Sequence, residues 1–156
     1  MQLNTTRLLS LSVLLLTLAP LASCSSGPAP IKESDPGAPI ILTTRTDPGT
    51  IELNRDLQPI RTPKIQADIE DLHSKVTEVT LEFEDIPVTV PMVNVGGSTW
   101  EVQLDDRALE MMAVSGQTAK YGATIMAINA DGKRALTEKP VEVAVKAPSL
   151  AKSSKT

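Results

Sequence analysis

The sequence is poor in reactive and metal-binding side chains. Its 156 residues include one cysteine, Cys24, and one histidine, His73. A single cysteine excludes a disulfide within the chain, so the fold must be held together by packing alone. Zinc and copper sites need several cysteine or histidine ligands, which this chain does not offer. The sequence therefore predicts no transition-metal cofactor.

An excess of positive charge is also lacking. Lys and Arg number 15 against 19 Asp and Glu, which gives a net charge of -4, and the basic residues form no stripe. Nucleic-acid binding depends on Lys and Arg neutralising phosphates. We therefore expect no nucleic-acid partner.

A catalytic triad can be assembled on paper but lacks its usual setting. Asp71, His73 and Ser74 lie in one polar stretch. A triad gathers partners from separate elements, with its nucleophile on a strained turn, and no such turn is visible here. We interpret His73 as a solvated loop histidine and expect a protein that is not an enzyme.

Calcium is an alternative use for four polar residues in turns, Asp105, Asp106, Asn129 and Asp131. Calcium takes oxygen ligands of this kind, but the same residues are also the ordinary choice for turns. The chain lacks the clustered Asp-x-Asp spacing of recognisable calcium sites. We favour turn formation over metal binding for these four residues.

The amino terminus has the layout of a secretory signal, with Arg7 before an apolar run that is too short for a membrane-spanning helix. The run ends in Leu21-Ala22-Ser23-Cys24, which resembles the lipobox of bacterial lipoproteins. That resemblance implies that residues 1–23 are a cleaved signal peptide and that Cys24 carries a covalent lipid. It places the mature protein in the bacterial cell envelope, anchored in a membrane. Ser25 follows the cysteine, and this choice implies the outer membrane.

Proline is concentrated after this cysteine, with seven of the twelve prolines between residues 25 and 63. Because proline fixes φ and removes a ladder donor, we expect residues 24–63 to form a tether. Apolar runs on either side of Asp47-Pro48-Gly49 allow a hairpin over residues 40–53, which could dock on the following domain. We predict that residues 148–156 form a disordered tail.

From residue 64 to residue 147 the hydrophobic period is two residues, which is typical of strands. Six alternating runs begin at Ile65, Val79, Val88, Trp100, Tyr121 and Val141. Residues 107–114 lack the alternation, and we favour a short helix there over a further strand. Short strands without long helical segments predict an all-β fold, an antiparallel β-sandwich.

Two segments of this region, residues 100–104 and 121–133, together resemble bacterial immunoglobulin-like (Ig-like) or fibronectin type III-like domains. The resemblance implies a sandwich of about seven strands over residues 64–147. It also implies that Tyr121 forms a tyrosine corner, with its ring in the core and its hydroxyl bonded to backbone. Such folds host many functions, so the resemblance does not specify an activity.

The aromatic side chains are few: Phe83, Trp100 and Tyr121. All three fall on the inward phase of their alternating runs, so we expect them in the core. A glycan-binding surface needs exposed rings for stacking. The sequence therefore disfavours glycan binding, which would require the alternative that Trp100 is an exposed platform on the surface.

An outward apolar surface is predicted instead. Met126 and Ile128 occupy the outward phase of their run, and Met111 and Met112 lie just upstream. Methionine adapts to varied partners, and exposed apolar patches commonly mark interaction sites. We predict that these four residues form a partner surface. The alternative is that residues 40–53 or the chain's own loops cover them.

Taken together, these features predict a lipid-anchored, non-catalytic lipoprotein of the bacterial cell envelope. Its Ig-like domain would bind a protein partner, as an assembly or accessory module. The alternative is a small-ligand or glycan-binding module of the cell surface. We expect no cofactor beyond the lipid on Cys24.

Overall fold

The computed structural model describes residues 33–149, and these residues form an all-β sandwich. Ten strands and one helix follow in chain order: β1 (Ile40–Asp47), β2 (Thr50–Glu52), β3 (Lys64–Glu70), β4 (Val76–Phe83), β5 (Thr89–Pro91), β6 (Val93–Gly96), β7 (Thr99–Gln103), α1 (Asp106–Met112), β8 (Thr118–Asn129), β9 (Arg134–Leu136) and β10 (Val141–Lys146). The predicted sandwich is confirmed. The strands outnumber the expected seven because β1 and β2 lie in the segment predicted as a tether, and because β6 and β9 are too short to give a clear alternating pattern.

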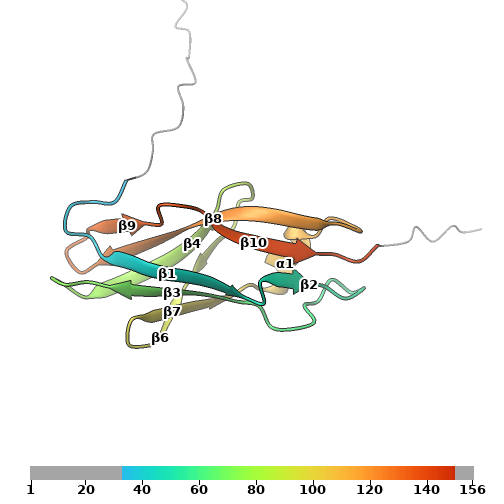
Figure 1. Cartoon of the computed structure of the whole chain (residues 1–156), viewed down its shortest axis with the longest axis horizontal. Coiled ribbons are helices and arrows are strands. Elements are labelled where there is room, and N and C mark those ends of the chain that lie inside the picture. Colours follow the sequence, from blue (N-terminus) through green and yellow to red (C-terminus); the bar gives the residue numbers. More distant parts are fainter. Residues whose placement is uncertain (1–32, 150–156) are drawn as a thin grey trace, which may run out of the picture. The chain divides into compact units, whose positions relative to one another are not determined.

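The strands form two sheets that lie face to face (Figure 1). The first sheet has the order β1-β3-β7-β6, and the second has the order β2-β10-β8-β4-β5, with β9 beside β8. Neighbouring strands are antiparallel, except that β2 runs parallel to β10. This order matches the Ig-like arrangement, in which strands A, B, E and D face strands C, F and G.

The predicted tether over residues 24–63 is too long, because residues 40–53 belong to the sandwich. β1 pairs with β3 along the first sheet, and β2 pairs with β10 in the second. The two strands therefore do not form with each other the hairpin that the sequence allowed. Instead, the chain changes sheets at Asp47-Pro48-Gly49. The domain begins well before the predicted boundary at residue 64.

The prolines of this region flank the strands instead of interrupting them. Pro39 precedes β1, Pro48 separates β1 from β2, and Pro63 precedes β3, so no strand loses an internal ladder donor. Ile51 of β2 has no exposed surface, and Leu53 is only 5% exposed. A proline-rich composition is therefore compatible here with two further strands of the core.

Alternate side chains from both sheets fill the core. The largest fully buried ones on the predicted inward phases are Ile65, Ile69, Leu81, Ile125, Val79, Val143 and Val145. Burying a side chain of this size stabilises the fold by about 1.5–3 kcal/mol. Phe83 is also buried, as predicted, whereas Tyr121 and Trp100 are only partly buried against this core.

The favoured short helix over residues 107–114 is confirmed as α1, which connects the two sheets. The Asp105 side chain caps it by accepting a hydrogen bond from the Ala108 backbone N–H at 2.8 Å. The Tyr121 hydroxyl donates to the backbone carbonyl of Met112 at 2.8 Å. This is the backbone hydrogen bond expected of a tyrosine corner, and it ties the end of α1 to β8.

Hydrogen-bonded carboxylates link the strands on the outer face of the first sheet. The Asp68 carboxylate of β3 accepts hydrogen bonds from the hydroxyls of Thr99 and Thr43, both at 2.7 Å. These hydroxyls, with Thr99 contributing most, lower the pKa of Asp68 below its ordinary value. The bonds favour the charged carboxylate and connect β1, β3 and β7.

A second carboxylate, Glu101 of β7, lies beside the Lys64 ammonium at 3.0 Å and accepts a hydrogen bond from the Gln66 amide at 2.7 Å. Lys64 contributes most to lowering the pKa of Glu101, and Gln66 adds to the effect. The Glu101 residue is only 8% exposed, so these partners replace much of its hydration.

These two carboxylates predict an acid-sensitive fold. A carboxyl group whose pKa is lower in the folded state stabilises the fold above its unfolded pKa, and loses that contribution as pH falls. We expect the thermal unfolding temperature to decrease as the pH is lowered from about 5 to about 3, because such groups become protonated in this range.

The test is thermal unfolding of Asp68→Asn and of Glu138→Gln across this pH range. Glu138 is exposed and makes no hydrogen bond through its side chain to a described residue, so it serves as the control. Asp68→Asn should reduce the pH dependence of the unfolding temperature, and Glu138→Gln should leave it unchanged. Equal pH dependence in all three proteins would contradict the prediction.

Candidate functional site

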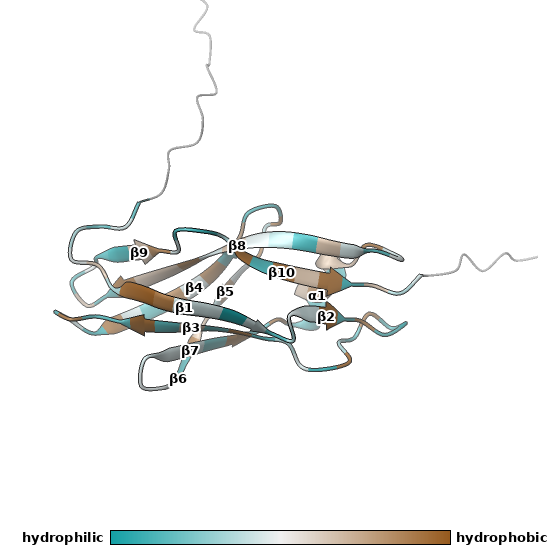
Figure 2. Cartoon of the chain, viewed as in Figure 1, coloured by the Kyte–Doolittle hydropathy of each residue, from teal (hydrophilic) through white to brown (hydrophobic). Residues whose placement is uncertain are grey.

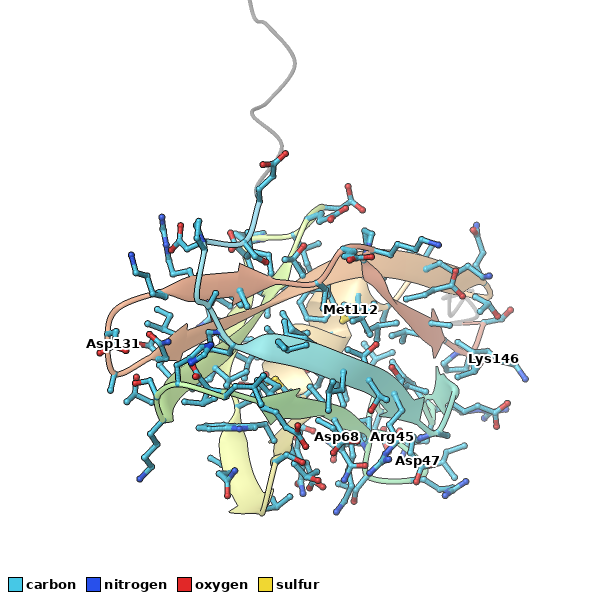
Figure 3. The ribbon with its side chains drawn as sticks, turned by 60° about the vertical axis from the view of Figure 1, so that its left-hand side comes forward. Arg45, Asp47, Asp68, Met112, Asp131 and Lys146 are labelled. Carbon is cyan, nitrogen blue, oxygen red and sulfur yellow. The ribbon has the colours of Figure 1, made fainter. Side chains whose placement is uncertain are left out.

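The predicted methionine surface is not one surface. Met112 is fully buried, because α1 turns Ala108, Leu109 and Met112 toward the core (Figure 3). This corrects the prediction for Met112. Met111, the next residue along the helix, is 44% exposed. Met111 and Met112 were grouped with Met126 and Ile128 because they lie just upstream in the sequence, and that proximity does not determine which face of the helix each side chain occupies.

Met126 and Ile128 do lie on the outward phase of β8, where they are partly exposed. On this face Met126 lies between Thr80 of β4 and Leu136 of β9. α1, by contrast, is bonded to Tyr121, which belongs to the inward phase of β8. The structure therefore does not bring Met111 together with Met126 and Ile128.

A groove that the sequence did not predict runs between β1 and β9. This edge groove has a volume of about 510 Å³ and is lined by Ser34, residues 39–44 and residues 135–139. Its exposed apolar side chains are Ile40, 48% exposed, and Leu42, 52% exposed. Figure 2 shows that β1 is hydrophobic at its amino-terminal end and hydrophilic toward its carboxyl-terminal end.

The position of Leu42 follows from an irregularity in β1. The register between β1 and β3 shifts between Ile41 and Thr43, which leaves Leu42 without a partner residue on β3. A bulge of this kind redirects the side chain of the extra residue. Leu42 consequently lines the edge groove instead of pairing across the sheet.

β1 is the longest strand at a sheet edge, and its outer edge has no partner strand. The other edge strands β2, β5 and β6 have three or four residues each. The outer edge of β9 is covered, because Arg134 N–H donates to the Asp35 carboxylate at 2.9 Å and Leu136 N–H donates to the Ser34 hydroxyl at 3.0 Å. Among the described strands, β1 therefore offers the longest open edge.

A second hollow lies at the end of the sandwich where Trp100 emerges from the core. This Trp100 cavity has a volume of about 690 Å³ and is lined by residues 69–72, residues 74–77, Asn94, Gly97, Ser98 and Trp100. Trp100 lies on the inward phase, opposite Ala67, as predicted. It is nevertheless only partly buried, and it lines the cavity. The expectation of a fully core indole is therefore wrong.

Two side chains hold the walls of the Trp100 cavity. The Asp71 carboxylate accepts hydrogen bonds from the backbone N–H groups of His73 at 2.8 Å and Ser74 at 2.7 Å, and from the Asn129 amide at 2.8 Å. The Asn129 amide, followed by the His73 N–H, lowers the pKa of Asp71. On the opposite wall, the Asn94 side chain bonds the backbone of Gly96 and Gly97.

The same contacts place the three residues of the triad considered from the sequence in one loop. The Asp71 carboxylate is engaged by the loop backbone and by Asn129, and the His73 side chain is exposed. Asp71, His73 and Ser74 therefore form a hydrogen-bonded turn.

The four calcium candidates are separated. Asp105 and Asp106 lie at the start of α1, whereas Asn129 and Asp131 lie at the turn between β8 and β9, at the other end of the domain (Figures 1 and 3). Asp105 caps α1, and Asp106 accepts a hydrogen bond from the Gln58 amide at 3.0 Å. Within residues 33–149 no group of three or more acidic or histidine side chains is placed to hold a metal ion.

Asn129 has a structural role that excludes it as a metal ligand. It is only 2% exposed, and its side-chain oxygen accepts hydrogen bonds from the N–H groups of Asp131 at 3.1 Å and Lys133 at 2.9 Å. Its amide group donates to Asp71 and to the Gly37 carbonyl, the latter at 3.2 Å. The burial of Asn129 could have been predicted from the sequence, because Asn129 continues the inward phase of β8.

The lipobox residues Leu21, Ala22, Ser23 and Cys24 lie outside the described residues, as does the part of the predicted tail beyond residue 149. Among residues 33–149, the helix is too short to span a membrane. Comparison of the chain with protein-family models and with characterised proteins found no match.

Proposed function

We propose that this protein is a lipid-anchored lipoprotein of the bacterial cell envelope whose sandwich binds a protein partner without performing catalysis. The anchor rests on Leu21-Ala22-Ser23-Cys24, which has the residue types and spacing of a lipobox. Two or more acyl chains are needed for stable anchoring, because one chain alone binds a membrane only marginally. Ser25 supports the outer membrane as the location.

The observation that carries the binding function is the open edge of β1 beside the edge groove. An unpaired strand edge presents backbone N–H and C=O groups that an extended segment can pair with. Ile40 and Leu42 lie at this edge with about half of their surface exposed, 48% and 52%. Backbone pairing supplies affinity in such complexes, and pockets for alternate side chains supply specificity.

The two halves of β1 differ in what they offer a partner. Arg45 and Asp47, in the second half, already interact with Asp68 and Arg61, at 4.0 Å and 3.5 Å respectively (Figure 3). The first half, residues 40–44, lines the edge groove. The proposed partner is therefore an extended segment with apolar side chains, which adds to the first half of β1.

Lipidation is tested with Cys24→Ser. We expect the wild-type chain to incorporate a fatty-acid label and to fractionate with membranes, because the cysteine sulfur is the attachment point. Cys24→Ser should lose both properties, whereas Ser26→Ala should retain them. Equal membrane association of the Cys24→Ser and wild-type proteins would contradict the anchor.

Docking is tested by photo-crosslinking in cells from position Leu42 of the lipidated protein. Thr89, an exposed residue of β5, provides the control position. We expect one dominant protein adduct from Leu42 and none from Thr89, because Leu42 lines the edge groove on the long strand β1, whereas Thr89 lies on the three-residue edge strand β5 away from this groove. A third position, Met126, tests the outer face of the second sheet.

A matched pair of substitutions tests the same edge without crosslinking. Leu42 and Ile60 are both exposed, at 52% and 63%, so lysine at either position should leave folding intact. Leu42→Lys should abolish co-purification of the crosslinked partner, because charged side chains protect an edge against strand addition. Ile60→Lys should preserve it. Undiminished co-purification with Leu42→Lys, or an adduct from Met126 alone, would refute docking at β1.

A further inference from the structure

We propose that the Trp100 cavity is a binding site for a neutral saccharide, with one sugar ring stacked on the Trp100 indole. The inference is independent of docking at the edge groove, since the two hollows share no lining residue. The volume of about 690 Å³ lies within the range of small-ligand sites, about 300–1,000 Å³. The sequence disfavoured glycan binding because all three aromatic rings were expected in the core. The partly exposed Trp100 removes that objection.

The cavity has fixed walls. The loop after β3 is held by three hydrogen bonds to Asp71, at 2.7–2.8 Å. The turn between β6 and β7 is held by the Asn94 side chain, and the Ser98 carbonyl accepts a hydrogen bond from the Ile69 N–H at 2.8 Å. A site whose walls are already ordered loses little conformational entropy on binding.

Several polar groups of the lining are free to bind a ligand. The Trp100 indole N–H, the Lys75 ammonium and the Ser98 hydroxyl make no hydrogen bond within the described part of the chain, and neither does the Glu70 carboxylate. The Trp100 indole N–H is not among the buried polar atoms of the described residues that lack a partner, so it is accessible from the cavity. Together these groups offer donors and an acceptor around one aromatic ring, which suits the hydroxyls and the apolar face of a sugar ring.

The charges of the lining select a neutral ligand. The cavity carries two carboxylates, Glu70 and Asp71, and one ammonium, Lys75. An anionic ligand would meet a lining with a net negative charge. Charges of the same sign in close contact repel each other, so this binding would be unfavourable. A cation would find only the Glu70 carboxylate free, because Asp71 is already engaged by three hydrogen-bond donors, and it would meet the Lys75 ammonium of the same lining. A neutral polyhydroxylated ligand has neither difficulty, because its hydroxyls accept from Lys75 and donate to Glu70.

The test uses the fact that the chain contains one tryptophan, so its indole N–H gives a single nitrogen–proton cross-peak in NMR. The lipidated full chain, in micelles of a detergent without a sugar headgroup, is titrated with N,N′,N″-triacetylchitotriose, maltotriose and cellotriose in turn, all of which are neutral. Each is raised to about 10 mM, where a dissociation constant of about 1 mM gives near saturation. We expect a saturable shift of the indole cross-peak with at least one of them.

Two variants separate the cavity from nonspecific effects. Lys75 is exposed, so Lys75→Ala should leave the fold intact and weaken saccharide binding about fivefold, the effect of losing one hydrogen bond. The matched control is Lys120 of β8, which pairs with Glu142 of β10 and does not line the cavity. Lys120→Ala should bind saccharide like wild type. The proposal is overturned if none of the three saccharides gives a saturable shift, or if the two variants bind equally.

Discussion

The structure depends on one buried amide, the side chain of Asn129. It lies at the inward end of β8 with 2% of its surface exposed, and its oxygen and nitrogen together make four hydrogen bonds. These bonds reach the segment before β1, the loop after β3 and the turn before β9. A buried polar group is tolerated only when its hydrogen bonds are made, so the amide fixes all three segments together.

Both candidate sites are built from the segments that Asn129 connects. Gly37 leads into β1, and the turn bonded at Lys133 leads into β9, so the two sides of the edge groove meet at this amide. Asp71, which orders the loop lining the Trp100 cavity, takes its third hydrogen bond from the same side chain. The protein thus combines a core that requires no disulfide with surface hollows whose walls are held by polar contacts.

Much of the fold followed from the sequence because buried strands alternate in hydrophobicity. The six predicted runs, the short helix and the bond of Tyr121 were all found. β1 and β2 were assigned to the tether, as a possible hairpin, because prolines between strands resemble prolines in a linker when the chain is read alone. Met112 was assigned to the surface because its helical phase depends on where α1 packs. The edge groove and the Trp100 cavity could not be predicted, since each joins segments far apart in the sequence.

The most direct test of this account is native-state hydrogen exchange of Asn129→Ala, together with its free energy of unfolding. The loss of a buried hydrogen-bonding group should lower that free energy by about 1–3 kcal/mol. Exchange of the Asp35 and His73 amides should accelerate about tenfold beyond that of the core amide of Leu81, because these amides belong to the segments that Asn129 holds. Equal acceleration at all three amides would contradict the account, as would no change at Asp35 and His73.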